Sequence, residues 1–434
     1  MRKLFGTDGI RGKAYEYPIN VDIAEKLGYA VALFSKQKKV AIGRDTRISG
    51  KELEQAAAKG VSKAGKEAVL LGILPTPAVA FLTRKLNAGA GIMISASHNP
   101  AEDNGLKVFS SEGYKLEDEK EETIESYMLN TQKETAGGKI TEYADAKRQY
   151  IDFAKKAFNG SAGGIKIVVD CANGAACNVA KDIFSDLKAE VTAINDSEDG
   201  SIINRGCGAL HTGSLKEAVL KEKADLGIAL DGDADRIIAV DETGRELDGD
   251  YLLYICAKLM KDKNRLKNNT VVATSMSNGG FEESMRMAGI AVKETKVGDK
   301  YVIEEMRKNN YSLGGEQSGH IIIADYSTTG DGILCGLEII KAIKEYKKPL
   351  SELANEVQKY PQVLINVPVR EKKEIKSLDS YALIQKAEKD LEGKGRVLVR
   401  YSGTEILLRV MVESKETPEI YAKEIADSLR KELS

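Results

Sequence analysis

Short apolar runs alternate with longer mixed segments along the first 130 residues, and this pattern predicts strands alternating with helices. Three runs are short and apolar, as buried strands are: 39–43, 68–71 and 91–94. Residues 50–65 and 76–85 have the composition of helices, and Ser49 with Glu52 fits a capping box before the first of them. The stretch 113–147, rich in Glu, Lys and Thr, predicts an exposed helix and a linker. Strands that alternate with helices favour a mostly parallel sheet.

The same alternation continues through a second and a third unit and ends in a smaller fourth one. The second unit starts near Gly164, with predicted strands at 165–170, 224–230 and 237–240. The third runs from about Gly249 to Tyr360, with a strand at 270–274 and helices at 251–261, 280–288 and 298–308. The fourth covers 362–434, with strands at 396–401 and 406–412 and a closing helix. Three consecutive α/β units indicate a repeated architecture.

Composition narrows the class of protein. With 434 residues the chain is too long for one hydrophobic core and should hold roughly three or four domains. Its 64 basic and 66 acidic residues give a net charge of -2, which argues against a nucleic acid or an anionic membrane as the main partner. Five scattered cysteines without a CxxC pair favour a reducing, cytoplasmic compartment. We see no signal peptide and no apolar run that would span a bilayer.

A polar loop follows the apolar run 91–94, and it is the first candidate for chemistry. It carries Ser97 and His98 and ends at Pro100, and Lys107 closes a second polar group at 103–107. A hydroxyl just past a buried strand lies where open α/β sheets place their active sites. Taken alone, however, such a loop is more often a turn with no chemistry.

Three aspartates at alternate positions, Asp231, Asp233 and Asp235, stand between two apolar runs. Carboxylates this close repel one another unless a cation lies between them, and hard oxygen ligands favour Mg²⁺ or Ca²⁺. We therefore expect loss of one carboxylate to relieve repulsion in the metal-free protein. An EF-hand is the competing interpretation, but Arg236 occupies the position that needs glycine. Three protein ligands leave room for a phosphate oxygen on Mg²⁺.

Two further loops carry residues that could bind a ligand, but their sequence patterns are less specific. Arg400 and Arg409 could grip a phosphate, and Ser402 and Thr404 could add donors, although a hairpin turn with incidental arginines is an equal alternative. The other loop offers an acceptor, a donor and an imidazole suited to sugar hydroxyls or an amine: Glu316, Ser318 and His320.

Taken together, the motifs resemble those of the α-D-phosphohexomutases, in the family's order and over nearly the whole chain. They are FGTDGIRG (5–12), GRDTRISG (43–50), SASHNP (95–100), DNGLK (103–107), DGDADR (231–236), GGEQSGH (314–320) and RYSGTE (400–405). VGDKYV (297–302), GGEQSGH and TTGDG (328–332) look like the phosphoglucosamine mutase branch. Four residues differ from the usual pattern: Ala234, Lys300, Tyr401 and Ile406.

The resemblance implies three similar α/β domains with mixed, mostly parallel sheets and a small C-terminal α+β domain, around a central cleft. The implied boundaries are a phosphoserine domain at 1–150, a metal-binding domain at 151–248, a sugar-recognition domain at 249–361 and a phosphate-binding domain at 362–434. It implies a cytoplasmic isomerase that interconverts glucosamine 6-phosphate and glucosamine 1-phosphate and feeds UDP-N-acetylglucosamine synthesis. Its partners would be a sugar phosphate, Mg²⁺ and a hexosamine 1,6-bisphosphate, with no nucleic acid or membrane; a homodimer stays open.

The resemblance also implies a role for each matching residue. Ser97 would carry the covalent phosphate and join Asp231, Asp233 and Asp235 as a Mg²⁺ ligand. Arg11, Lys107 and His98 would take part in catalysis. The substrate would contact Arg236, Glu316, Ser318, His320, Arg400, Ser402, Gly403, Thr404 and Arg409. Two alternatives remain: a phosphomannomutase/phosphoglucomutase, and a non-catalytic sugar-phosphate-binding protein on the same scaffold.

Overall fold

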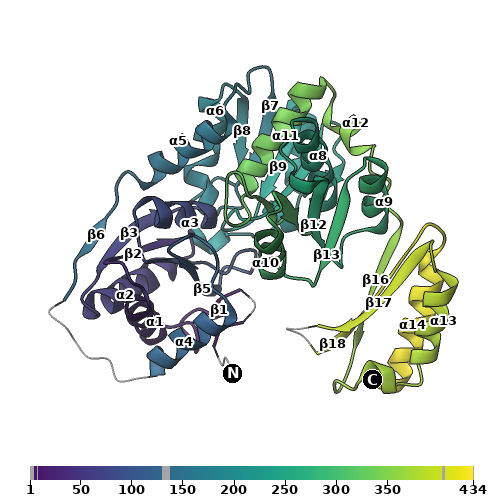
Figure 1. Ribbon diagram of the computed structural model, residues 1–434, viewed down its shortest axis with the longest axis horizontal. Coiled ribbons are helices and arrows are strands. Elements are labelled where there is room, and N and C mark those ends of the chain that lie inside the picture. The colour runs from purple at the N-terminus through teal and green to yellow at the C-terminus, as the bar shows by residue number, and fades with distance from the viewer. Residues whose placement is uncertain (1–3, 7, 130–136, 403–405, 434) are drawn as a thin grey trace. The chain divides into compact units, whose positions relative to one another are not determined.

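The computed structural model describes residues 4–6, 8–129, 137–402 and 406–433 (Figure 1). The chain divides into two compact units, residues 1–276 with 288–356 and residues 277–287 with 357–434. Within the described residues, the first unit contains three mixed sheets and the second contains one antiparallel sheet. The predicted α/β class, with mostly parallel mixed sheets and a small C-terminal domain, is confirmed. The four domain boundaries and the central cleft stay predictions.

The first sheet has the order β1-β5-β4-β2-β3-β6. Its strands are β1 (Ile10–Lys13), β5 (Asp103–Ser110), β4 (Ala90–Ile94), β2 (Lys39–Arg44), β3 (Glu67–Ile73) and β6 (Ile140–Glu142). The pairs from β4 to β6 are parallel, whereas β5 is antiparallel to both β4 and β1. Helices α1 (Val21–Phe34), α2 (Gly50–Lys63) and α4 (Asp118–Leu129) pack their apolar residues on one face, and α3 (Thr76–Lys85) packs against β2 and β4 (Figure 1).

Several local predictions for this region need correction. Ser49 makes no capping hydrogen bond to α2; its hydroxyl accepts a hydrogen bond from Asn104 instead. The polar group 103–107, for which no element was predicted, forms the first part of strand β5, because Leu106 and its apolar neighbours continue the sheet core. Helix α4 is not simply exposed, since Ile124 and Met128 are buried against α1.

Two smaller sheets complete the first unit. One has the order β11-β10-β9-β7-β8 and the other β13-β12-β14-β15. Their strands are β7 (Lys166–Asp170), β8 (Glu190–Ile194), β9 (Leu226–Leu230), β10 (Ile237–Asp241), β11 (Glu246–Leu247), β12 (Thr270–Thr274), β13 (Ala291–Thr295), β14 (Leu313–Gly315) and β15 (Ile321–Ile323). The helices around them are α5 (Ala146–Phe158), α6 (Ala180–Asp186), α7 (Gly213–Glu222), α8 (Gly249–Asp262), α10 (Asp299–Asn309), α11 (Gly332–Tyr346) and α12 (Leu350–Ala354).

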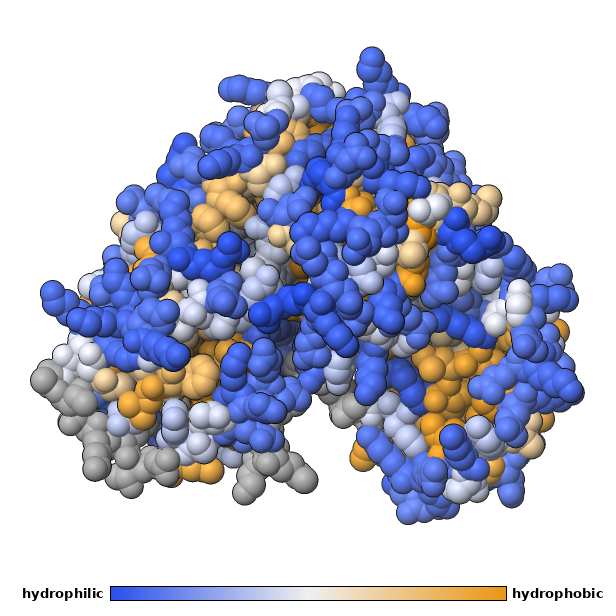
Figure 2. Space-filling view, in the orientation of Figure 1, coloured by the Kyte–Doolittle hydropathy of each residue, from blue (hydrophilic) through white to orange (hydrophobic). Residues whose placement is uncertain are grey.

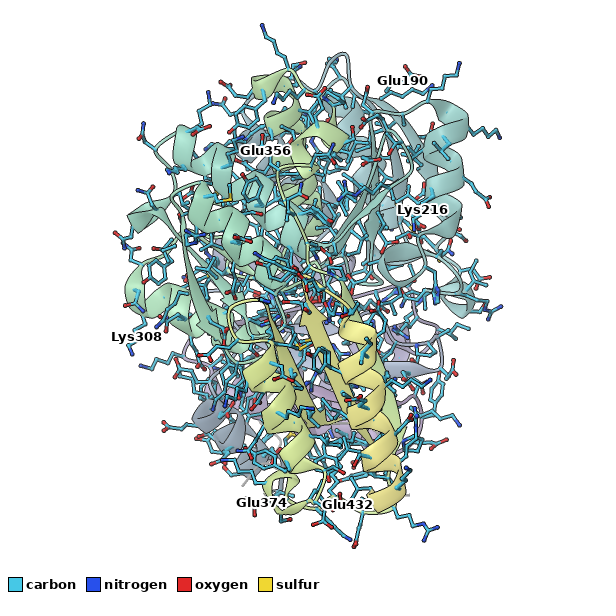
Figure 3. All side chains as sticks on the ribbon, turned by 90° about the vertical axis from the view of Figure 1, so that its right-hand side faces the viewer. Glu190, Lys216, Lys308, Glu356, Glu374 and Glu432 are labelled. Atoms are coloured by element: carbon cyan, nitrogen blue, oxygen red, sulfur yellow. The ribbon has the colours of Figure 1, made fainter. Side chains whose placement is uncertain are left out.

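The second unit is built on the antiparallel sheet β16-β18-β17. Its strands are β16 (Gln362–Pro368), β17 (Gly395–Tyr401) and β18 (Leu407–Ser414), and its helices are α9 (Gly279–Met287), α13 (Tyr381–Asp390) and α14 (Pro418–Leu433). Figure 3 looks onto α13 and α14, which cover the sheet. Glu432 of α14 accepts hydrogen bonds from Ser380 at the start of α13, so a polar contact joins the two helices.

The face of the molecule in Figure 2 is mostly hydrophilic, with apolar patches among charged side chains, the broadest of them at the lower right of the view. This fits a chain in which 30% of residues are charged. Of the described helices, none combines the length and apolar character needed to cross a membrane.

Candidate active site

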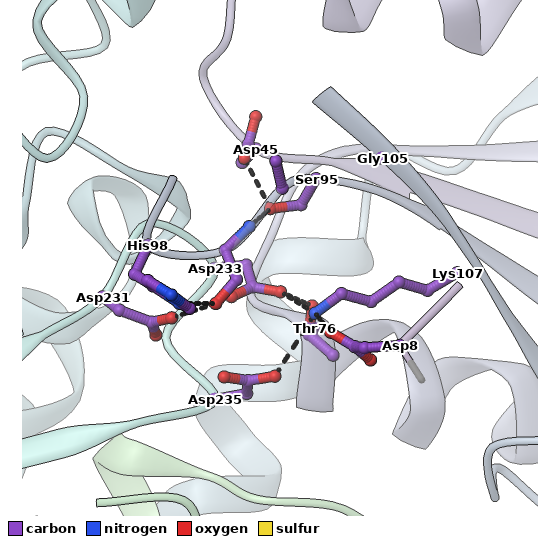
Figure 4. A network of polar contacts seen from close by, with 12 residues as sticks. Asp8, Asp45, Thr76, Ser95, His98, Gly105, Lys107, Asp231, Asp233 and Asp235 are labelled. Carbon is purple, nitrogen blue, oxygen red and sulfur yellow. Dashed lines mark hydrogen bonds and ion pairs between the residues drawn. The ribbon is translucent and has the colours of Figure 1, made fainter. Parts of the chain in front are cut away.

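Ser97 lies in the loop between β4 and β5, and its side chain reaches a carboxylate from a different sheet. Its hydroxyl Oγ donates to Oδ2 of Asp231 at 2.5 Å and lies 3.2 Å from Nδ1 of His98 (Figure 4). The residue is buried, and its φ of 54° is a left-handed conformation that costs a non-glycine residue about 1–2 kcal/mol. A strained, buried hydroxyl beside a carboxylate is typical of a functional site.

The three predicted metal ligands come from the loop between β9 and β10. Asp231, Asp233 and Asp235 are all buried, and one carboxylate oxygen from each lies within 4.8 Å of the others. Within the described chain, Oδ1 of Asp233 and Oδ1 of Asp235 accept no hydrogen bond. Ala234 has a φ of 57°, which explains why glycine suits this position. Buried carboxylate oxygens with spare acceptor capacity fit a hard divalent cation.

The pKa values of Asp231 and Asp235 shift in opposite directions. Burial, with repulsion from Asp235 and Asp233, raises the pKa of Asp231 well above its usual range. Burial would also raise the pKa of Asp235, but Lys107 and His320 outweigh it and lower that pKa.

Lys107 and Arg11 reach the same region from neighbouring antiparallel strands. Arg11 on β1 pairs with Gly105 on β5, so Arg11 and Lys107 project from the same face of the sheet. Lys107 Nζ lies 2.7 Å from Oδ2 of Asp233, and Arg11 donates to the carbonyl oxygen of Ala96 at 3.3 Å. Both cations therefore lie beside the serine loop or the aspartates; the acid–base role that the resemblance implies for them stays a prediction.

Asp8 is the centre of a charge network that the sequence did not reveal. Its carboxylate forms ion pairs with Arg11, Lys107 and Lys115. Burial alone would raise the pKa of Asp8, but these three cations hold that pKa well below its usual range. Lys115 also pairs with Asp299, the first residue of α10. No local sequence signal links Lys115 with Asp299, because they are far apart in the chain.

The predicted sugar loop joins β14 to β15, and its three candidate residues differ in exposure. Ser318 is exposed and Glu316 is half-buried, with Oε1 accepting from the main-chain nitrogen of Gly298 at 3.0 Å. His320 is buried, and its Nε2 lies 3.6 Å from Asp299 and 3.9 Å from Asp235. Arg236 follows the aspartates, and although burial opposes it, Asp235 and Asp231 raise the pKa of Arg236.

The predicted phosphate loop belongs to the second unit. Arg400 on β17 lies directly opposite Arg409 on β18, and Ser402 follows β17 and is buried. Burial and the nearby Arg409 lower the pKa of Arg400. Two cross-strand arginines repel each other, so this strand pair favours an anion between them. Gly403 and Thr404, also predicted for this loop, lie outside the described residues.

Four domain families match the chain in order. They are the phosphoglucomutase/phosphomannomutase alpha/beta/alpha domain I over residues 2–135, domain II over 142–244, domain III over 248–360, and the C-terminal domain over 364–432. The phosphoglucosamine mutase of Shouchella clausii is 47% identical over the full length of both chains. That of Pelobacter propionicus is 49% identical over 100% of this chain and 99% of its own. This chain belongs to the phosphoglucosamine mutase family.

Members of this family are phosphohexomutases, which are isomerases that need a metal and a bisphosphate intermediate. Solved structures share the fold. A phosphoglucomutase/phosphomannomutase family protein from Burkholderia thailandensis has a TM-score of 0.82 at 23% identity, covering 99% of this chain and 96% of its own. The N-acetylphosphoglucosamine mutase of Aspergillus fumigatus, solved with GlcNAc-6P and magnesium, has a TM-score of 0.69 at 19% identity, covering 99% and 96%.

Proposed function

We propose that this phosphoglucosamine mutase family member interconverts glucosamine 6-phosphate and glucosamine 1-phosphate through a phosphorylated Ser97. The observation that carries the proposal is the Ser97 hydroxyl, buried and 2.5 Å from Asp231, at the edge of the aspartate triplet. Lys107 lies on the other side of the triplet, 2.7 Å from Asp233. A nucleophile, a carboxylate cluster and cations are the parts that phosphoryl transfer needs.

The proposed reaction has two phosphoryl transfers, the first from Ser97 to the sugar and the second from the sugar back to Ser97. In the first, O1 of glucosamine 6-phosphate attacks the phosphorus on Ser97, and the bond from phosphorus to Oγ breaks. The sugar is then a 1,6-bisphosphate, which turns over in the site. In the second, Ser97 Oγ attacks the phosphorus on O6, and glucosamine 1-phosphate leaves. Each transfer moves one proton from the attacking hydroxyl and returns one to the leaving oxygen.

Arg11 and Lys107 are proposed to handle those protons, with His98 beside the serine oxygen. His98 Nδ1 is 3.2 Å from Ser97 Oγ, and burial together with Arg236 and Arg11 lowers the pKa of His98 to about 4. The imidazole is therefore neutral at neutral pH, and because the Ser97 hydroxyl donates to Asp231, Nδ1 of His98 would donate to the serine oxygen. Arg11 and Lys107 keep positive charge near the transferring phosphoryl group.

Asp231, Asp233 and Asp235, with an oxygen of the Ser97 phosphate, are proposed to hold Mg²⁺. The unpaired Oδ1 atoms of Asp233 and Asp235 support this, because a buried carboxylate oxygen with no donor favours a cation. When bound, Mg²⁺ would neutralise charge that develops on the phosphoryl oxygens. The protein itself fixes the three carboxylates on a short loop between two buried strands.

The remaining predicted residues are proposed to bind the sugar and the non-reacting phosphate. Glu316 and Ser318 would contact the sugar, with His320 and Arg236 beneath them. Phosphate would bind to Arg400, Ser402, Gly403, Thr404 and Arg409. All five cysteines are free thiols, which supports a cytoplasmic setting.

A comparison of hexose phosphates tests the proposed substrate. The enzyme should first be fully phosphorylated with a hexose 1,6-bisphosphate, so that activation does not limit the rate. We expect the highest kcat/KM with glucosamine phosphate and weaker activity with glucose 1-phosphate, as a property of the whole loop 315–320. A clear preference for mannose or glucose phosphate would make the chain a phosphomannomutase/phosphoglucomutase, and no turnover of any of them would favour a binding protein.

A further inference from the structure

A buried ion pair between Asp45 and Arg47 lies behind the loop that carries Ser97. Nε of Arg47 lies 3.0 Å from Oδ2 of Asp45, and neither side chain has exposed surface. Asp45 directly follows β2, which runs parallel to β4, the strand that leads to Ser97. The ion pair and the serine loop therefore start at the same edge of the sheet.

The guanidinium group of Arg47 uses all five of its N–H donors on protein acceptors. One reaches Asp45. Three reach carbonyl oxygens of the serine loop, those of Ser97 (2.9 Å), Asn99 (2.8 Å) and Pro100, and the fourth reaches the carbonyl oxygen of Asp103 (2.8 Å) at the start of β5. A lysine has three donors on a single nitrogen and could not span these acceptors.

The same ion pair also holds the other side of Ser97. Oδ2 of Asp45 accepts from the hydroxyl of Ser95 at 2.6 Å, and that hydroxyl accepts from the main-chain nitrogen of Ser97 at 2.9 Å (Figure 4). Both main-chain polar groups of Ser97, its N–H and its C=O, are therefore tied to the pair of Asp45 and Arg47.

A second donor reaches this carbonyl from the segment between β8 and β9. Nδ2 of Asn204 donates to the carbonyl oxygens of Ser97 at 2.8 Å and Asn99 at 3.0 Å. The main chain of Gly232 lies so close that a Cβ there would come within 2.5 Å of the Ser97 oxygen. The carbonyl is thus enclosed between Arg47, Asn204 and the aspartate loop.

We propose that Arg47 is a positioning residue for phosphoryl transfer, and that it fixes the left-handed main chain of Ser97. The inference rests on the proposed role of Ser97 as phosphate carrier. A serine that gives its phosphate to one hydroxyl and takes it back from another must keep Oγ in one place while its charge changes. The bonds from Arg47, supported by Asn204, hold the φ of 54° that the loop alone would relax.

Single-turnover transfer tests this role with two variants and a matched control. Wild type, Arg47→Lys, Asn204→Gly and Arg205→Lys are phosphorylated with glucose 1,6-bisphosphate, and occupancy of Ser97 is measured by intact mass. Phosphoryl loss to glucosamine 6-phosphate is then followed by rapid quench at several sugar concentrations. Arg205 is exposed and next to Asn204, so Arg205→Lys controls for the chemistry of the substitution.

We expect Arg47→Lys to slow the transfer step about 100-fold and Asn204→Gly about 10-fold, because small misplacements of reacting groups are this costly. The half-saturating sugar concentration should change less than about threefold, since neither residue is placed in the sugar loop. Arg205→Lys should match wild type.

Transfer at the wild-type rate by Arg47→Lys, or a defect in half-saturation alone, would overturn the positioning role. If thermal denaturation shows that Arg47→Lys does not fold, the transfer rate of Asn204→Gly tests the positioning of the Ser97 main chain instead. This variant should fold, because Asn204 is half-buried and its φ of 58° suits glycine. Wild-type enzyme that passes phosphate from Ser97 to no hexose phosphate would contradict the proposed function instead.

Discussion

The ammonium group of Lys107 lies 2.7 Å from Oδ2 of Asp233, and both side chains are buried. The same nitrogen lies 3.4 Å from Asp235 and 3.2 Å from Asp8. The aspartate triplet is therefore balanced in part by a cation of the protein. From the sequence we expected loss of a carboxylate to relieve repulsion in the metal-free protein, whereas for Asp233 the ion pair with Lys107 favours the opposite outcome.

We predict that Asp233→Asn lowers the free energy of unfolding in EDTA by about 2–3 kcal/mol, because it breaks a buried ion pair and leaves Lys107 undercompensated. Mg²⁺ binding should weaken as well. Urea denaturation with and without Mg²⁺, together with calorimetric titration of the metal, measures both effects. The control is Asp152→Asn, which removes an exposed carboxylate on α5. A more stable Asp233→Asn protein in EDTA would contradict this account.

His98 should make the fold less stable as pH falls. Burial, with Arg236 and Arg11, lowers the pKa of His98 to about 4, whereas an unfolded histidine has a pKa of about 6.5. Between these values the unfolded chain binds more protons, so stability falls with decreasing pH by about 3 kcal/mol in total. His98→Gln should remove this slope, which chemical denaturation between pH 4 and 7 would reveal. An unchanged slope would show that His98 is accessible to protons in the folded state.

Asp331, the N-cap of α11, should change the pH dependence of stability in the opposite direction to His98, over nearly the same pH range. Burial raises its pKa to about 6, while an unfolded aspartate titrates near about 3.9. Between these pKa values the folded state binds more protons than the unfolded chain. Protonated Asp331 therefore contributes stability that is fully present below about pH 4 and is lost as pH rises through about 6. Asp331→Asn should therefore make stability rise more steeply with pH than in wild type, and His98→Gln should do the reverse.

Contiguous motifs let the sequence locate Ser97 and the aspartate loop, because their groups are close along the chain. Arg47, Asn204 and Lys115 were missed because their partners are remote: Asn204 meets a loop more than a hundred positions earlier. Sequence periodicity carries no information about such contacts. The structure shows these contacts: Arg47 and Asn204 both reach the serine loop, and Lys115 reaches Asp299 at the start of α10.

Prediction of the helices from the sequence was also incomplete. Helix α11 was not predicted, since most of its residues are buried and it lacks one polar face to reveal a helical period. Helix α1 was also not predicted, although Asn20 caps it by accepting from Ile23 at 3.0 Å and provides a readable start signal. Helix α3, by contrast, matches its predicted range.

Arg400 should destabilise the fold while strengthening the binding of the hexose phosphate. It lies opposite Arg409, and two like charges at this spacing destabilise a strand pair, so Arg400→Gln should stabilise the fold by about 0.5 kcal/mol. The same change should raise KM for the hexose phosphate about tenfold or more, because it removes a charge-assisted contact to phosphate. Steady-state kinetics and denaturation measure the two effects, with exposed Arg370→Gln as control. An unchanged KM would remove Arg400 from the phosphate site.

Transfer of phosphate from Ser97 to glucosamine 6-phosphate tests the central claim most directly. Enzyme treated with a hexose 1,6-bisphosphate should gain one phosphate on the peptide that contains Ser97, and mixing with glucosamine 6-phosphate should remove it and yield the 1,6-bisphosphate. Ser97→Ala should fold, because it loses only the hydroxyl's hydrogen bonds to Asp231 and His98, at a net cost of about 1 kcal/mol each, and it should neither gain phosphate nor turn over. Phosphate on another residue, or full turnover by Ser97→Ala, would contradict the account.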